Sequence, residues 1–349
     1  MSELCDVETV RGKVRSDALG VTLMHEHLFV DWSRAWPESA RRGRADLRES
    51  PVTIDLLGDL RMDPYAAVDN QRLDSEELAA KELEYFRSAG GVTIVDPTGK
   101  WPGRKPTSQR ALAENLGINI VACTGYYLEP SHPEEVRRSS VQELADSMAA
   151  EVLEGIGDTG IRAGLIGEIG ISLYFTAQEE KILRAAARAQ RATHVPLMVH
   201  MPSAGKFGDR ILDIIEEEGG SIAGTILCHL NWEVDDLYYQ IRLLERGCFT
   251  EYDMLGMTFY YPEDHGQAPC DRENLKAITA LLRLGFEQRI LLASDVFLKN
   301  MLRAYGGNGY DYVLKHFVPR LEDAGVRAEV VKTLLVANPR RVFEAAREG

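Results

Sequence analysis

The fold is decided by the stretch V-T-L-M-H-E-H-L-F-V, residues 21–30. Its apolar and β-branched residues predict a buried strand that ends near the two histidines. Similar short runs recur along the chain and are bounded by polar or glycine-containing segments. They predict seven further strands, over 92–97, 119–124, 162–169, 196–201, 225–230, 248–253 and 290–296.

Amphipathic helical segments separate these strands. One begins with a capping box, in which Thr176 precedes Glu179 by three residues. Two others end before Gly247 and Gly285, and glycine allows the left-handed conformation that closes many helices. Eight strands alternating with helices predict a (β/α)8 TIM barrel, and we expect residues 1–349 to form one such domain. The alternative is a doubly wound open sheet, but no strand end carries a glycine-rich phosphate loop.

Two segments fall outside this alternation. Residues 6–20 predict a short N-terminal hairpin ahead of the first strand. Residues 31–73 form a long insertion after that strand, and its length exceeds that of an ordinary βα loop. We therefore expect this insertion to lie over one end of the barrel as a lid.

Composition and charge exclude several classes of protein. The formal net charge is −14, whereas a nucleic-acid-binding surface needs a basic footprint. No apolar run reaches the ~18–20 residues of a membrane span, and the first residues lack the pattern of a secretory signal. The five cysteines include no C-x-x-C pair, which indicates reduced thiols. We expect a cytoplasmic protein that binds neither nucleic acid nor membranes.

Histidines and carboxylates occur at the ends of five predicted strands. In a (β/α)8 barrel the carboxyl ends of the strands meet at the face where active sites are built. His25 and His27 are two residues apart, so both imidazoles should project to one side while Glu26 turns away. The six strand-end residues are His25, His27, Glu168, His200, His229 and Asp295.

This residue set is typical of a transition-metal site. Imidazole and carboxylate ligands suit Zn²⁺ and its first-row neighbours, whereas Mg²⁺ and Ca²⁺ prefer oxygen ligands. Six ligands are too many for one tetrahedral ion and match two ions that share a carboxylate. We predict two divalent metal ions, with Zn²⁺ as the first candidate and Mn²⁺, Co²⁺ and Fe²⁺ as alternatives. Taken singly, each histidine could instead be a structural polar residue.

Several motifs also resemble one known family. They are T-V-R-G at 9–12, L-G-V-T-L-M-H-E-H-L at 19–28, V-D-P-T at 95–98, Y-G-G-N-G-Y at 305–310 and A-N-P-R-R-V-F at 337–343. With them the chain resembles the phosphotriesterase-related proteins of the amidohydrolase superfamily over residues 7–343. The resemblance implies a binuclear metal hydrolase on a (β/α)8 barrel.

The resemblance also implies roles for the strand-end residues. In that family the H-x-H histidines and the strand-8 aspartate bind one ion, which here implies His25, His27 and Asp295. The strand-5 and strand-6 histidines, here His200 and His229, bind the other ion. The residue that matches the bridging ligand is Glu168, where phosphotriesterases proper and their close lactonase relatives carry a carboxylated lysine. A glutamate is the pattern of the phosphotriesterase homology and resiniferatoxin-binding-like branches.

The expected chemistry is hydrolysis. Two metal ions lower the pKa of a bridging water, so that a hydroxide attacks the substrate carbonyl while one ion stabilises the oxyanion. Glu168 and Asp295 are the predicted catalytic residues, and Asp295 either accepts a proton or serves as a ligand alone. The predicted substrate is a lactone, a carboxylic ester or an amide. The alternatives are an organophosphate hydrolase, a ligand-binding barrel with little catalysis, and lyase or isomerase chemistry on the same scaffold.

Substrate contacts are expected in the loops that follow the strands. The candidate residues are Tyr126, Tyr127, Met257, Tyr260 and Lys299. Lys299 and Arg104 would favour a substrate with an anionic group remote from the scissile bond, because the net negative charge repels anions elsewhere. The expected partner is a small-molecule substrate, and a homodimer is the candidate assembly.

Overall fold

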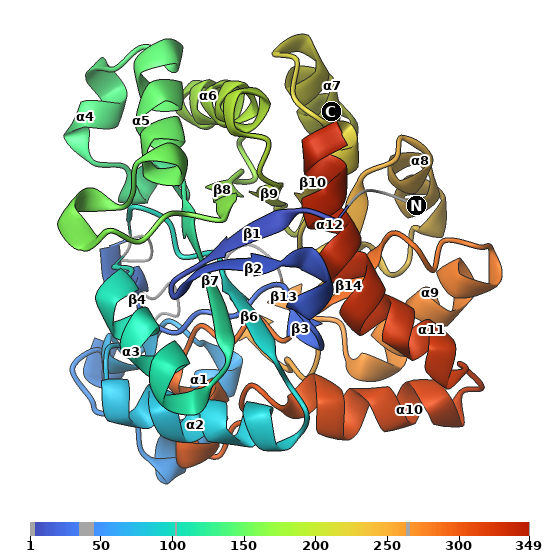
Figure 1. Cartoon of the computed structure of the whole chain (residues 1–349). Helices are drawn as coiled ribbons and strands as arrows, with labels where there is room; N and C mark the ends of the chain where they lie inside the picture. The colour runs from blue at the N-terminus through green and yellow to red at the C-terminus, as the bar shows by residue number, and fades with distance from the viewer. Residues whose placement is uncertain (1–3, 35–44, 102, 263–265, 349) are drawn as a thin grey trace.

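The chain folds into a curved parallel sheet surrounded by helices (Figure 1). The computed structural model describes residues 4–34, 45–101, 103–262 and 266–348. Eight strands pair in parallel in the order β14-β11-β10-β9-β8-β7-β6-β3. They are β3 (Thr22–Leu23), β6 (Thr93–Asp96), β7 (Asn119–Thr124), β8 (Leu165–Gly170), β9 (Leu197–His200), β10 (Thr225–Leu227), β11 (Phe249–Tyr252) and β14 (Ile290–Leu292). Each overlaps a predicted strand, and the (β/α)8 barrel is confirmed.

The helices lie outside the sheet. They are α1 (Leu57–Met62), α2 (Glu76–Ser88), α3 (Pro106–Leu116), α4 (Glu134–Arg138), α5 (Val141–Leu153), α6 (Ala177–Thr193), α7 (Gly208–Glu217), α8 (Leu237–Glu245), α9 (Asp271–Arg283), α10 (Val318–Asp323), α11 (Ala328–Lys332) and α12 (Asn338–Glu348). The predicted capping box of α6 is present, since Thr176 and Glu179 each accept the other's backbone N–H. Gly247 and Gly285 follow α8 and α9 with φ of +94° and +90°, as predicted. In the part of the chain that the structure describes, no helix is both long and apolar enough to cross a membrane.

The N-terminal hairpin covers the end of the barrel that faces the viewer in Figure 1. Its strands, β1 (Asp6–Thr9) and β2 (Gly12–Arg15), pair antiparallel as predicted. Alternate strand residues point inward and form a core that includes Val7 of the hairpin and Phe343 of α12. The strand residues of this core include Val95, Val121, Leu165, Met198, Ile226, Phe249 and Leu291. The barrel interior is therefore packed at this end, which leaves the other end for a site.

The seam between the first and last strands is closed by backbone hydrogen bonds and by one side chain. β3 and β14 share no strand ladder in the described part of the chain. Just beyond them, the backbone N–H of His27 donates to the carbonyl of Val296 at 3.1 Å. The carboxylate of Glu26 accepts the backbone N–H groups of Ser294 and Val296 at 2.8 and 2.9 Å. Glu26 thus links the two strands through hydrogen bonds that a continued ladder would otherwise supply.

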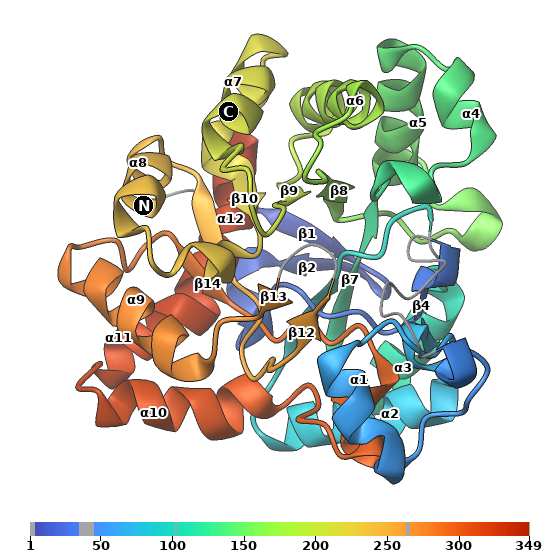
Figure 2. The same cartoon turned by 180° about the vertical axis from the view of Figure 1, so that it is seen from behind.

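The insertion after the first strand lies at the opposite end of the barrel (Figure 2). At its base β4 (Val30–Asp31) pairs antiparallel with β5 (Arg72–Leu73). Its helix α1 contacts β12 (Tyr260–Tyr261), which pairs with β13 (Gly266–Gln267). Residues 35–44 of the predicted lid lie outside the described residues. The described part of the insertion occupies the position expected of a lid.

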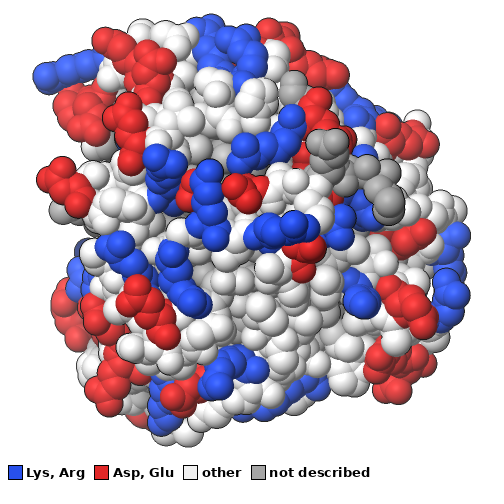
Figure 3. Space-filling view, in the orientation of Figure 1, with Lys and Arg blue, Asp and Glu red and all other residues white. Residues whose placement is uncertain are grey.

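Acidic and basic side chains are interspersed on the face drawn in Figure 3. Acidic and basic side chains also pair between α6 and α7, where Arg184 lies within 2.9 Å of carboxylate oxygens of Glu180, Glu217 and Glu218. Partly exposed pairs of this kind each contribute about 0–1 kcal/mol to stability. The net charge of −14 is therefore not gathered into one acidic patch on this face.

Gly164, just before β8, tests the fit of the hairpin on the barrel. A Cβ atom there would lie 2.4 Å from the carbonyl oxygen of Glu8, so Gly164→Ala should cost about 1–3 kcal/mol through overpacking. A Cβ atom added at Gly58 in α1 would have no atom within 4 Å. Gly58→Ala should therefore leave stability unchanged or slightly higher. Urea unfolding of both variants makes the comparison. Equal stability of the two variants would contradict the packing argument.

Candidate metal centre

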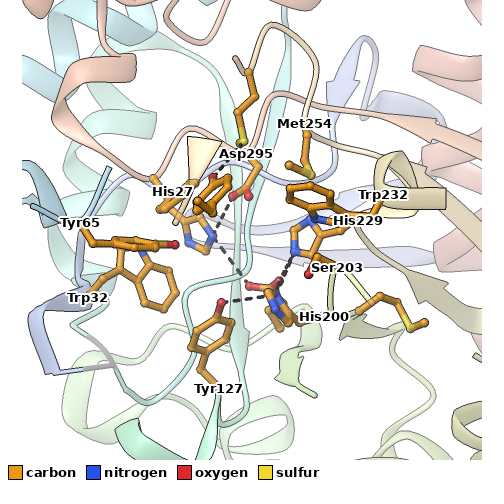
Figure 4. A pocket seen from close by; sticks show the side chains of 15 residues that line it. His27, Trp32, Tyr65, Tyr127, His200, Ser203, His229, Trp232, Met254 and Asp295 are labelled. Atoms are coloured by element: carbon orange, nitrogen blue, oxygen red, sulfur yellow. Dashed lines mark hydrogen bonds and ion pairs between the residues drawn. The ribbon is translucent and has the colours of Figure 1, made fainter. Parts of the chain in front are cut away.

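The six predicted strand-end residues meet at the open end of the barrel. Figure 4 labels four of them, His27, His200, His229 and Asp295. The Nε2 atom of His25 lies 3.5 Å from Oδ1 of Asp295, and that of His27 lies 3.3 Å from the same oxygen. Both imidazoles therefore project to one side, as their spacing predicted. Four overlapping groups of described residues have their donor atoms within 4.8 Å of one another, and three of them consist of these six residues only: His25, His27 and Glu168; His25, His229 and Asp295; and Glu168, His200 and His229.

Glu168 stands between two sets of histidines. Its Oε1 atom lies 2.7 Å from Nδ1 of His200 and 2.9 Å from Nε2 of His229. Its Oε2 atom lies 3.7 Å from Nε2 of His25 and 4.0 Å from Nε2 of His27. One carboxylate oxygen thus faces each histidine pair, which is the arrangement that a shared ligand of two cations requires.

Burial and charge shift the pKa values in this cluster. Burial alone would raise the pKa of Glu168, but the imidazoles of His200 and His25 outweigh it and hold that pKa well below its usual range. Burial would lower the pKa of His229, yet the carboxylates of Asp253 and Glu168 raise it to about 10. The pKa of His200 is lowered, mainly by burial. Because histidine binds a metal as the neutral imidazole, an entering cation would displace protons from this cluster.

The donor set fits divalent cations. Both ring nitrogens of His25 and the Oδ1 atom of Asp295 are buried and have no hydrogen-bond partner among the described residues. Buried polar atoms without a partner cost free energy, and a cation placed between these nitrogens and carboxylates would remove that cost. Nitrogen with carboxylate oxygen is the chemistry that Zn²⁺ and its first-row neighbours accept.

Asp253, which sequence reasoning missed, holds His229 and lies close to His25. Its Oδ1 atom lies 2.8 Å from Nδ1 of His229, and its Oδ2 atom lies 3.4 Å from Nδ1 of His25. It also accepts the backbone N–H of His229 at 2.9 Å, and His229 has a positive φ of +59°. Carboxylates bonded to the second ring nitrogen orient metal-binding histidines. A signal for Asp253 was present, because Glu251 in β11 and Asp253 just after it have the same two-residue spacing as the H-x-H pair.

His27 is held from the neighbouring strand. Its Nδ1 atom lies 2.7 Å from the Thr98 hydroxyl. The carboxylate of Asp96, at the end of β6, accepts the backbone N–H groups of Leu28 and Thr98 at 3.1 and 3.0 Å. Two residues of the V-D-P-T motif, Asp96 and Thr98, therefore hold the end of the first strand in place.

An aromatic cavity of about 540 Å³, open solvent at its mouth included, leads to the cluster. Of the predicted substrate contacts, Tyr127 and Met257 line it. Tyr127 directs its hydroxyl toward His200, 3.4 Å from Nδ1 (Figure 4), and burial raises the pKa of its phenol well above the usual range. A neutral hydrogen-bond donor therefore faces the cluster.

Most of the cavity wall was missed by sequence reasoning. Its aromatic rings form a continuous series of neighbours. The distances between ring centroids are 4.6 Å for Tyr127 and Trp32, 6.3 Å for Trp32 and Phe297, 6.5 Å for Phe297 and Tyr65, 5.9 Å for Tyr65 and Tyr261, and 5.9 Å for Tyr261 and Trp232. Three of them follow a strand-end ligand by two to five residues, namely Trp32, Trp232 and Phe297. That proximity was the available signal.

Three predicted substrate contacts lie away from this cavity. Tyr260 points outward with 36% of its surface exposed, while the next residue, Tyr261, lines the cavity, because successive strand residues face opposite sides. Tyr126 packs instead near Lys100 and His132. Lys299 pairs with Asp69 and lines a separate cavity beside α2.

The two cations expected to anchor an anionic group, Arg104 and Lys299, are each paired with a carboxylate of the protein. Arg104 pairs with Glu151 at 2.7 Å, and Lys299 is taken up by Asp69. Neither cation lines the cavity. These two residues therefore give no support to an anionic group in the substrate.

A family model described as the phosphotriesterase family matches residues 5–343. The chain belongs to this family. The resemblance seen in the sequence motifs is thereby confirmed, and the match places the chain among hydrolases.

Individual relatives align with nearly the whole of this chain. An N-acetyltaurine hydrolase from Danio rerio is 34% identical over 98% of this chain and 99% of its own. The crystal structure of a resiniferatoxin-binding protein from Rhodobacter sphaeroides is 47% identical, with a TM-score of 0.95 over 99% of this chain and 96% of that chain. The phosphotriesterase homology protein from Escherichia coli, crystallised with phosphate in its active site, is 29% identical, with a TM-score of 0.77 over 94% and 99%.

If this phosphotriesterase-family protein holds the two predicted ions per chain, Glu168→Gln should reduce its metal content to one ion or fewer. The variant keeps the size of the side chain and removes the charge that faces both histidine pairs. Glu344→Gln is the matched control, because Glu344 is also buried but bonds to Ser16 and Arg340 instead. Metal analysis by mass spectrometry gives the readout. Two ions retained in Glu168→Gln would exclude the bridging role.

Proposed function

We propose that the chain is a metal-dependent hydrolase that cleaves an amide, a carboxylic ester or a lactone at its carbonyl carbon. The observation that carries this proposal is the position of Glu168, with one carboxylate oxygen toward each histidine pair at the base of an open cavity. His25, His27 and Asp295 would hold one divalent ion, His200 and His229 the other, and Glu168 both. Zn²⁺ is the first candidate, with Mn²⁺, Co²⁺ and Fe²⁺ as alternatives.

An amide is the first substrate class to test. The relative from Danio rerio, similar over nearly its whole length, is named for hydrolysis of N-acetyltaurine, which is an amide. Amides, esters and lactones share a carbonyl carbon that becomes tetrahedral on attack by water. The absence of Arg104 and Lys299 from the cavity wall leaves the charge of the substrate open.

Metal ions bound here would supply a hydroxide near neutral pH and polarise the substrate oxygen. The protein's own residues have distinct tasks around that chemistry. Asp295 presents a buried, unpartnered Oδ1 atom at the cluster, from which it can accept a proton and return it to the leaving group. Tyr127 offers a neutral hydroxyl to the substrate. The rings of Trp32, Phe297 and Trp232 bind apolar parts of the substrate and exclude water.

Asp295→Asn separates the proton acceptor from the ligand. The amide keeps an oxygen for a metal ion but accepts a proton poorly, so kcat should fall by about 10²–10⁴. Metal content measured on the same samples provides the control. A fall in activity that only parallels metal loss would leave Asp295 as a ligand without a role in proton transfer.

A substrate panel tests the proposed function directly. N-acyl amino acids and N-acyl amino sulfonates, carboxylic esters, lactones and organophosphate triesters are compared by kcat/KM on metal-loaded protein. We expect one of the carbonyl classes to be fastest, with amides first. Triesters that outrun every carbonyl substrate would favour the organophosphate alternative, and binding without turnover across the panel would favour the ligand-binding barrel.

A further inference from the structure

We propose that Glu26 is a positioning residue that sets Asp295 against His25 and His27. This inference rests on the proposed metal centre. Glu26 lies between the two histidines in the sequence, but its side chain turns away from the cavity and toward β14. It is fully buried.

The backbone around Asp295 is held by residues of the first strand end. Three successive N–H groups are involved: that of Ser294 donates to Glu26 at 2.8 Å, that of Asp295 to the carbonyl of His25 at 3.2 Å, and that of Val296 to Glu26 at 2.9 Å. The two carboxylate oxygens of Glu26 therefore bind the backbone amides on either side of Asp295. These hydrogen bonds lie beyond the point where the regular strand pairing of β14 ends.

Asp295 needs such a constraint because its backbone is left-handed, with φ of +47°. L-residues adopt this conformation only where the surroundings impose it, although aspartate tolerates it better than most. The conformation places Oδ1 of Asp295 3.5 and 3.3 Å from Nε2 of His25 and His27. One glutamate thus fixes the relative position of the three residues proposed to hold one ion.

The chain contains a matched control for this contact. Glu82 of α2 is also buried, and its two carboxylate oxygens accept the backbone N–H groups of Arg303 and Ala304 at 3.0 and 2.9 Å. Each glutamate accepts two backbone N–H groups of one segment, but the segment that Glu82 holds carries none of the proposed metal ligands. A purely structural role would make the two glutamates equivalent.

The test compares Glu26→Gln and Glu82→Gln with the wild-type chain loaded with Co²⁺. In both variants an amide NH₂ group would face a backbone N–H, so both should unfold at lower temperature. Cobalt stoichiometry, the visible spectrum and release to a chelator are then measured on folded protein. We expect Glu26→Gln to hold one of two cobalt ions about 10–100-fold more weakly, with an altered spectrum, as is usual when a support of metal ligands is lost. Glu82→Gln should bind cobalt like the wild type.

Wild-type cobalt affinity and spectrum in Glu26→Gln would overturn the proposal and leave Glu26 as a structural link only. If Glu26→Gln does not fold, Glu26→Asp decides by the same measurements, because the shorter carboxylate cannot reach both amides at once. Unchanged cobalt binding in folded Glu26→Asp would likewise overturn it. Failure of the wild-type chain to bind two cobalt ions is a different result, since it would refute the proposed metal centre itself.

Discussion

Buried carboxylates that accept backbone N–H groups are the constraint on which this barrel mouth depends. Strand ends that present ligands must leave the regular ladder, and their amides then need other acceptors. Glu26 serves the strand end that carries Asp295, Asp96 serves the one after His27, and Asp253 serves His229. Each acceptor comes from the neighbouring strand. The ligand positions are therefore determined between strands.

The hydrogen-bond partners of the buried carboxylates separate structural carboxylates from candidate metal ligands. Glu26 and Asp96 accept backbone N–H groups with both of their carboxylate oxygens, so their hydrogen bonds are satisfied within the protein. Glu168 and Asp295 face imidazoles instead, and a cation can replace the protons of those imidazoles. Asp253 does both, since it bonds the amide and the ring of His229. Burial makes each of these contacts strong, because an unpaired charge there would be costly.

The cavity above the cluster is built differently from the cluster itself. Its rings come from the loops and the insertion, whereas the cluster comes from strand ends, so the wall can vary while the proposed ligands stay in place. Trp32 and Tyr65 of the insertion contact Phe297 of the last loop.

Local periodicity in the sequence determined the eight strands, the capping box of α6 and the six residues at the strand ends, because strand repeats and end positions depend on near neighbours. The tertiary structure decided which loop residues reach the cavity. Tyr127 and Tyr261 line the cavity, whereas Tyr126 and Tyr260 do not, because the path of the loop sets the direction of each side chain. It also decided that Lys299 pairs with Asp69, 230 residues away. Contacts between residues so far apart produce no local pattern in the sequence. The hydrogen bonds of Glu26 to the backbone on either side of Asp295 are of this kind.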